Sequence, residues 1–189
     1  MAKKSIITIA GAIGSGKSST AKRVAEDLGY KHFSSGDLFR ATAAERGLSV
    51  EALNLTAEEQ EEIDYEVDEL LKKMGREEER LVIDSRLAFH WMPDSFKVYL
   101  KLDHNTAAKR IFNHLNTEGR LSQSATSVED VRGSIDTRVE SEQKRYRNLY
   151  DIDVSDLSPF DFIIDTRVNS LNRVVELVIE NYKLWKNEK

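Results

Sequence analysis

The sequence predicts a three-layer α/β fold in which a five-stranded, mainly parallel sheet is covered by helices on both faces. Short β-branched apolar runs alternate along the chain with longer segments of helical periodicity, and this alternation implies right-handed crossovers between parallel strands. The 189 residues suit one compact domain. No stretch rich in Pro, Gly or Ser separates two parts of the chain. We therefore expect residues 1–189 to form a single domain.

Five apolar runs predict the strands, over residues 5–10, 30–33, 80–84, 95–102 and 160–165. Gly29 stands just before the second run, where it can end the first helix in a left-handed conformation. The run over 5–10 is too short for a secretory core of roughly 7–15 apolar residues or a membrane helix of about 20. We expect it to be a buried strand.

Two helices have clear patterns. The last one begins behind a Ser170 cap and should pack on the sheet, because its apolar residues follow a 3.6-residue spacing: Leu171, Val174, Val175, Val178, Ile179, Tyr182 and Trp185. The other is expected to begin at Thr56, which forms a capping box with Glu59, and to carry its apolar face as far as Met74. We expect the acidic face of this helix to be solvated.

Composition excludes several classes of protein. The 28 Lys and Arg against 33 Asp and Glu leave a net charge of −5, which disfavours nonspecific binding to nucleic acid or to an anionic membrane. The absence of cysteine excludes disulfides, cysteine-ligated zinc and thiol nucleophiles, and it fits a reducing compartment. The four histidines have no metal-ligand spacing. We expect a cytoplasmic protein with no nucleic-acid or membrane partner.

A phosphate-binding loop follows the first strand. Residues 11–18 read Gly-Ala-Ile-Gly-Ser-Gly-Lys-Ser, a full match to G-x-x-x-x-G-K-[ST]. The glycines let consecutive backbone N–H groups bind phosphate oxygens, Lys17 adds a charge, and Ser18 can bind Mg²⁺. A dinucleotide-binding turn is the rival interpretation, but Ser19 takes the place of its third glycine. The predicted ATP-binding residues of the loop are Gly11, Ala12, Ile13, Gly14, Ser15, Gly16, Lys17, Ser18 and Ser19.

A carboxylate at the end of the third predicted strand suits the same site. Asp84 closes the run Leu-Val-Ile-Asp, where an acidic group of a P-loop protein meets Mg²⁺. A helix-capping role for Asp84 is the alternative when the loop is left aside. With the loop, Ser18 and Asp84 are the predicted metal ligands.

Residues 34–40, Ser-Ser-Gly-Asp-Leu-Phe-Arg, resemble the nucleoside monophosphate kinases. The order and spacing of further motifs, at 44–49, 62–64, 86–88, 145–146, 150–153 and 161–166, are similar to those of the archaeal-type cytidylate kinases over most of the chain. The sequence departs from that pattern at Ser85, which replaces a glycine, and at His114, which replaces an arginine.

The resemblance implies a division of the chain and a set of roles. It implies a core of about 1–33, 80–112 and 150–189, an acceptor-binding segment of about 34–79 and a lid of about 113–149. Arg40 and Arg86 would hold the acceptor's phosphate, Arg110 would stack on the donor base, and the lid would carry Arg138 and Arg145. The implied acceptor-binding residues are Ser35, Gly36, Asp37, Arg40, Asp64 and Arg86.

Phosphoryl transfer needs several cations around the transferred group. Arg138 and Arg145 are seven residues apart, two helical turns, so both can point toward one ligand. The predicted catalytic residues are therefore Lys17, Arg138 and Arg145.

The predicted function is transfer of a phosphoryl group from ATP, with Mg²⁺, to a nucleoside monophosphate, CMP or dCMP above others, by a monomer. Adenylate kinase and other small-molecule P-loop kinases are the alternatives among enzymes, although Ser85-Arg86 does not match the Gly-Phe-Pro-Arg run of adenylate kinases. A nucleotide-operated binding module without turnover is the alternative of another class. Turnover of ATP with and without monophosphates distinguishes these functions.

Overall fold

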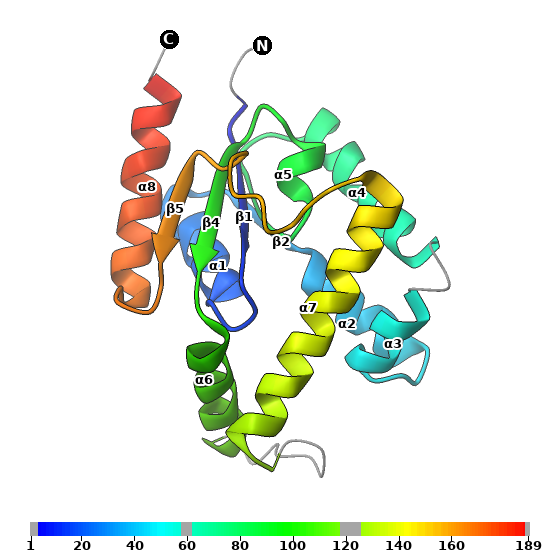
Figure 1. Cartoon of the computed structure of the whole chain (residues 1–189). Helices are drawn as coiled ribbons and strands as arrows, with labels where there is room; N and C mark the ends of the chain where they lie inside the picture. The colour runs from blue at the N-terminus through cyan, green and yellow to red at the C-terminus, as the bar shows by residue number, and fades with distance from the viewer. Residues whose placement is uncertain (1–3, 58–61, 118–125, 188–189) are drawn as a thin grey trace.

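The sheet has five parallel strands in the order β2-β3-β1-β4-β5. Figure 1 shows the computed structural model, which describes residues 4–57, 62–117 and 126–187. All five predicted strands form within two residues of their expected bounds, and the predicted α/β fold is confirmed. The strands are β1 (Ile6–Gly11), β2 (Lys31–Ser34), β3 (Leu81–Asp84), β4 (Phe96–Lys101) and β5 (Phe162–Asp165).

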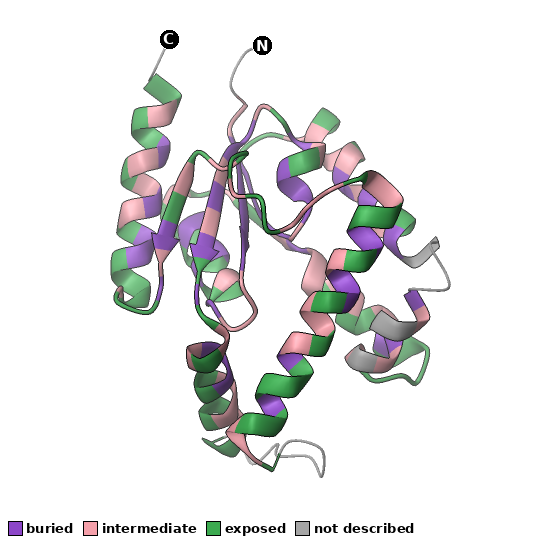
Figure 2. Ribbon diagram, viewed as in Figure 1, coloured by how far each residue is buried: buried purple, intermediate pink, exposed green. Residues whose placement is uncertain are grey.

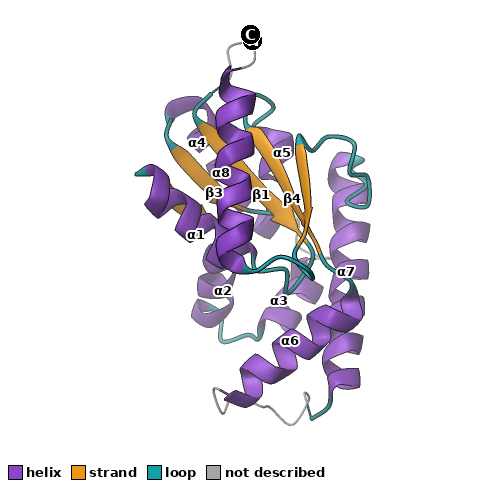
Figure 3. Cartoon of the chain, turned by 90° about the vertical axis from the view of Figure 1, so that its left-hand side faces the viewer, coloured by secondary structure: helices purple, strands orange, loops and turns teal. Residues whose placement is uncertain are grey.

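Helices cover both faces of this sheet, as Figure 3 shows for the face that carries α1 and α8. Helices α4 and α5 pack on the opposite face, and α6 packs against α7. The described residues form α1 (Lys17–Leu28), α2 (Ser35–Glu45), α3 (Val50–Ala57), α4 (Glu62–Glu77), α5 (Ala88–Trp91), α6 (His104–Thr117), α7 (Val128–Tyr150) and α8 (Leu171–Asn187). In this part of the chain, no helix combines the length and the apolar character that crossing a bilayer requires.

The core lies on both sides of β1, the central strand, which is buried along its whole length (Figure 2). Ile7 and Ile9 belong to the cluster that includes α1 and α8, whereas Ile6 belongs to the cluster under α4 and α5. A strand buried on both faces explains why the run over 5–10 is continuously apolar rather than alternating. Gly11, which ends the strand, passes so close to β4 that a Cβ atom would collide with the carbonyl oxygen of Leu100.

Two of the predicted helix ends are confirmed. Gly29 adopts a left-handed conformation (φ 64°) and ends α1. At the start of α8, the Ser170 hydroxyl accepts from the Arg173 backbone N–H at 3.4 Å, and the Ser170 carbonyl accepts from Val174 N–H at 2.9 Å. Four of the apolar residues behind this cap, Val174, Val175, Val178 and Tyr182, are buried against the sheet.

The predicted helix start at Thr56 is wrong. Thr56 lies in the last turn of α3, where its hydroxyl donates to the Ala52 carbonyl at 2.9 Å, and Glu59 lies outside the described residues. The helix that contains Thr56, α3, begins at Val50 because the Ser49 hydroxyl accepts from the Ala52 N–H at 3.0 Å and so caps its N-terminus. A second helix, α4, then starts at Glu62.

The acidic face of α4 is not fully solvated, which also corrects the prediction. Asp64 and Asp68, one helical turn apart, are 7% and 3% exposed. Trp91 of α5 and Tyr150 of α7 both donate hydrogen bonds to the Asp68 carboxylate. Neighbours from other helices therefore bury a face that looks solvated in the sequence of α4 alone.

Candidate active site

The phosphate loop lies at the carboxyl edge of the sheet, between β1 and α1. Gly14 and Gly16 adopt positive φ values of 72° and 86°, which lets the chain turn sharply from strand to helix. The first N–H groups of α1 have no intrahelical acceptor and so are available to an anion. The Ser15 hydroxyl is buried and has no hydrogen-bond partner among the described residues.

Lys17 is the first residue of α1 and folds back over the loop. Its Nζ donates to the carbonyl oxygens of Gly11 at 3.0 Å and Ala12 at 2.9 Å. Burial, followed by the positive charge of Arg86, lowers the pKa of Lys17 to about 7. An incoming phosphate would add negative charge beside this amine, to that of Asp84 and Glu142, which favours its protonated form.

Ser18 and Asp84 meet beside the loop. The Ser18 hydroxyl donates to Asp84 Oδ2, and the Ser34 hydroxyl donates to the same oxygen at 3.1 Å. A hydroxyl and a carboxylate are hard oxygen ligands, and Mg²⁺ bound with a nucleotide takes few protein ligands because it keeps waters and phosphate oxygens. The two predicted metal ligands therefore fit a Mg²⁺ ion. The described residues hold no cluster of three or more His, Cys, Asp or Glu side chains suited to a metal.

The start of α2 forms another wall. Ser34 caps the helix by accepting from the Asp37 backbone N–H at 3.3 Å, and Arg40 follows one turn inside. Asp37, which was predicted to bind the acceptor, is ion-paired with Arg40 and does not line the cavity. The Ser35 hydroxyl donates to the Asp84 carbonyl at 3.4 Å, which joins α2 to the metal side of the site.

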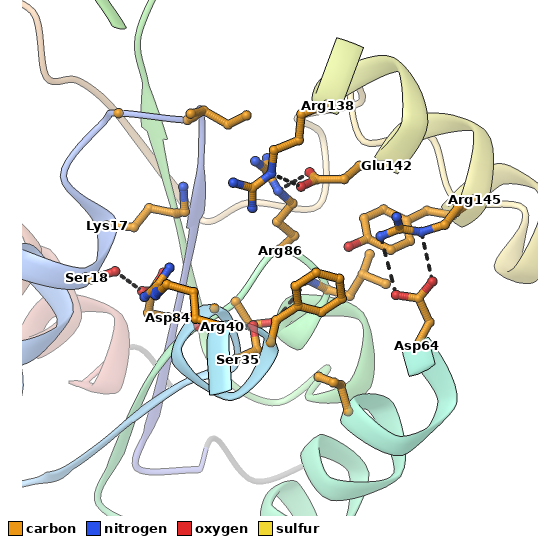
Figure 4. A pocket seen from close by; sticks show the side chains of 18 of the residues that line it. Lys17, Ser18, Ser35, Arg40, Asp64, Asp84, Arg86, Arg138, Glu142 and Arg145 are labelled. Carbon is orange, nitrogen blue, oxygen red and sulfur yellow. Dashed lines mark hydrogen bonds and ion pairs between the residues drawn. The ribbon is translucent and has the colours of Figure 1, made fainter. Parts of the chain in front are cut away.

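Helix α7 brings its charges to the same cavity. Arg138 donates through Nε to Glu142 at 2.8 Å, and the Nε of Arg86, which follows β3, is ion-paired with the other oxygen of Glu142 (Figure 4). Burial opposes the ionisation of Glu142, but Arg86 and Arg138 together hold its pKa below the usual value. Sequence reasoning missed Glu142, although its position four residues after Arg138 matches the spacing of a helical ion pair.

A second buried ion pair joins α7 to α4. The Nε of Arg145 lies 2.9 Å from Asp64 Oδ2, and the side chains are 4% and 9% exposed. Burial raises the pKa of Asp64 to about 6, against the lowering effect of Arg145. One turn further along α4, burial also raises the pKa of Asp68. Asp68 lines the cavity too and was missed, because its burial depends on the aromatic residues of α5 and α7.

These groups surround one cavity of about 480 Å³, within the range of small-molecule sites. Arg110 does not line it and donates instead to the Thr166 carbonyl after β5, at 2.6 Å. His114, one of the departures from the family pattern, does line it. The structure gathers fourteen of the predicted site residues there: Ile13, Gly14, Gly16, Lys17, Ser18, Ser19, Ser35, Gly36, Arg40, Asp64, Asp84, Arg86, Arg138 and Arg145.

Known proteins share this sequence pattern and this fold. A family model described as an AAA domain matches residues 10–129. The cytidylate kinase of Methanothrix thermoacetophila is 39% identical over 161 residues, which cover 85% of this chain and 88% of that protein. The cytidylate kinase of Haloarcula marismortui is 38% identical over 164 residues, covering 85% and 80%. A solved structure of shikimate kinase from Acinetobacter baumannii has a TM-score of 0.61 at 14% identity and covers 98% and 96% of the two chains, which shows the fold alone.

Proposed function

Because this chain belongs to the cytidylate kinase family of P-loop proteins, we propose that it transfers the γ-phosphoryl group of ATP to a nucleoside monophosphate, CMP or dCMP. One structural observation supports this proposal most strongly. Most of the phosphate loop, with Lys17 and Ser18, lines the same cavity as the arginines Arg40, Arg86, Arg138 and Arg145, which come from other elements. A nucleotide switch needs one anion site, whereas two phosphate-bearing substrates need cations on both sides of the transferred group.

The donor would bind at the loop. The N-terminus of α1 and the Lys17 ammonium would hold the β- and γ-phosphates, and Ser18 with Asp84 would hold Mg²⁺, which neutralises charge on the phosphate oxygens when bound. The buried Ser15 hydroxyl supports an anion at this place because nothing in the described residues satisfies it. Arg110 donates to the Thr166 carbonyl and does not line the phosphate cavity. It would stack on the donor's base.

The acceptor would bind opposite, between α2 and α4. Arg40 and Arg86 would hold its phosphate, and Ser35, Gly36 and Asp64 would line its subsite. One oxygen of that phosphate forms the new P–O bond to the γ-phosphorus as the bond to the ADP oxygen breaks. An oxygen already ionised at neutral pH needs no general base, so catalysis consists of orienting the two phosphates and neutralising the spreading charge. Lys17, Arg138 and Arg145, which line the same cavity, would supply that charge.

We also propose that residues of about 113–149 act as a lid over a core of about 1–33, 80–112 and 150–189, and that residues of about 34–79 form the acceptor-binding segment. A closing lid excludes water and brings its arginines to the reacting group. The negative net charge and the lack of cysteine support a cytoplasmic enzyme that works on small nucleotides, without nucleic acid or membrane. We propose that it acts as a monomer.

A panel of five monophosphates tests the proposed function. We expect ADP to form from ATP and Mg²⁺ rapidly with CMP and dCMP, and much more slowly with AMP, UMP and GMP in parallel reactions. ADP formation that does not depend on any monophosphate would favour a hydrolase or a switch. Fastest turnover with AMP would favour an adenylate kinase and contradict the assigned acceptor.

Arg40→Ala is expected to raise the KM for CMP about 10- to 100-fold, the cost of one or two charge-assisted hydrogen bonds, and to change the KM for ATP little. The Arg40 side chain is 52% exposed, so its removal should leave stability unchanged. Steady-state kinetics with each substrate varied in turn measures the difference. Arg23→Ala, at an exposed ion pair on α1, is the matched control. Equal increases in the two KM values would refute the two-sided site.

A further inference from the structure

Phosphates bind positively charged groups, but the cavity is also lined by Glu142, which carries a negative charge. Its side chain is only 5% exposed. A buried carboxylate repels the phosphates of both substrates and costs desolvation energy unless it is paired. Its presence beside the transfer site therefore requires a use that outweighs that repulsion.

Each carboxylate oxygen of Glu142 takes a different arginine. Oε2 pairs with Arg86, which follows β3, and Oε1 accepts from Arg138, which lies one turn earlier on α7. Figure 4 shows dashed lines from the Glu142 carboxylate to both arginines, whose guanidinium groups lie on the Lys17 side of it. One buried anion thus joins two cations from the core and from the proposed lid.

Both contacts are made through Nε, the guanidinium nitrogen nearest the stem. A guanidinium has five N–H donors in a planar fork, four of them on the terminal nitrogens. Holding the group by Nε fixes the plane of the fork and leaves three of the four terminal N–H groups pointing in directions other than that of the carboxylate. One of them, on Nη1 of Arg86, donates to the Gly11 carbonyl at 3.4 Å, at the edge of the phosphate loop.

We propose that Glu142 is a positioning residue for phosphoryl transfer, which holds Arg86 and Arg138 side by side with their terminal N–H groups facing the phosphates. This inference rests on the proposed function. Two adjacent guanidinium groups repel each other, and their long side chains have many rotamers. A shared buried counter-ion cancels the repulsion and orders the side chains before the substrates arrive. Preorganised charge lowers the barrier of the reaction more than it tightens ground-state binding.

Glu142→Gln tests this role because glutamine keeps the side-chain length, removes the charge and offers one acceptor oxygen where two arginines need one each. We expect kcat with CMP to fall about 100-fold, as for the loss of one preorganised donor. The Kd of ATP without acceptor, measured by calorimetry, should stay equal or become lower, because a negative charge near the anion site is gone. Glu140→Gln, at an exposed position of the same helix, should change each quantity by no more than about twofold.

Three outcomes would overturn the inference. A kcat close to the parent's would mean that the arginines are ordered without Glu142. A higher kcat would mean that the carboxylate blocks the phosphate site. A joint loss of kcat, ATP affinity and melting temperature would mean a packing role. Each of these three outcomes is interpreted for an unsubstituted protein that turns over CMP. An unsubstituted protein that turns over no monophosphate would refute the proposed function instead.

A double-mutant cycle adds a second readout. If Glu142 acts through the two arginines, Glu142→Gln should lower kcat much less in an Arg138→Ala background than in the parent, so the combined loss falls short of the product of the single losses. Losses that multiply in full would show that Glu142 acts independently of Arg138, and would overturn the proposal even if the single variant is slow.

Discussion

Lys17→Ala is expected to lower kcat for phosphoryl transfer about 1,000-fold, the upper range for removing one preorganised donor. Among the described residues, the Lys17 ammonium donates to the carbonyl oxygens of Gly11 and Ala12, within its own loop. It is thus held at the phosphate site without serving as a packing element. The variant should fold normally, since the glycine conformations that shape the loop do not depend on the lysine side chain.

Steady-state turnover of ATP and CMP measures this effect, with circular dichroism to confirm the fold. Lys22→Ala, at an exposed lysine of the same helix, is the matched control and should behave like the parent. An activity of Lys17→Ala within about tenfold of the parent, roughly 1.4 kcal/mol of barrier, would contradict a catalytic role for this lysine.

Arg138→Ala and Arg145→Ala should each lower kcat by about 100-fold or more, but they should differ in stability. Arg138 is 33% exposed, and Glu142 keeps Arg86 as a partner when Arg138 is removed, so this loss should cost less free energy of unfolding than that of Arg145. Arg145 is 4% exposed and paired with Asp64. Its removal leaves a buried carboxylate without this cation, which typically costs about 3–5 kcal/mol.

Thermal unfolding and steady-state kinetics, measured on the same samples, separate the two effects. Adding Asp64→Asn to Arg145→Ala should restore much of the lost stability, because the stranded charge is removed, while turnover stays low. Arg147→Ala, at a half-exposed position of α7, is the control on the same helix. If Arg138→Ala and Arg145→Ala both turn over like the parent, α7 does not supply the catalytic charge.

The wrong helix start at Thr56 and the unpredicted burial of Asp68 have the same cause. A capping box or an acidic helix face is a local pattern, and several local patterns compete for the same chain. Ser49 caps a helix, α3, that begins before Thr56 and continues to Ala57, so the predicted helix start at Thr56 lies inside it. At Asp68 the tryptophan and tyrosine that bury the carboxylate come from positions 91 and 150, which no window of α4 contains.

Sequence alone determined the features that depend on short stretches of chain. The strands follow from continuous apolar runs, and the loop at 11–18 follows from its glycines, lysine and serine, because backbone conformation and phosphate binding are encoded within eight residues. Asp84 could be placed near Ser18 because the ends of parallel strands meet at one edge of the sheet. The contact between their side chains agrees with that placement.

Only the tertiary structure decided which charges neutralise one another. Arg86 and Arg138 are 52 residues apart in the chain, yet both pair with the buried carboxylate of Glu142. Arg145 and Asp64 are 81 residues apart, yet they pair with each other. Whether an arginine faces a substrate or a carboxylate depends on distances and burial set by the packing of α7 against the core and α4. Electrostatic energy varies with separation and with local dielectric, and neither quantity is written in the order of residues.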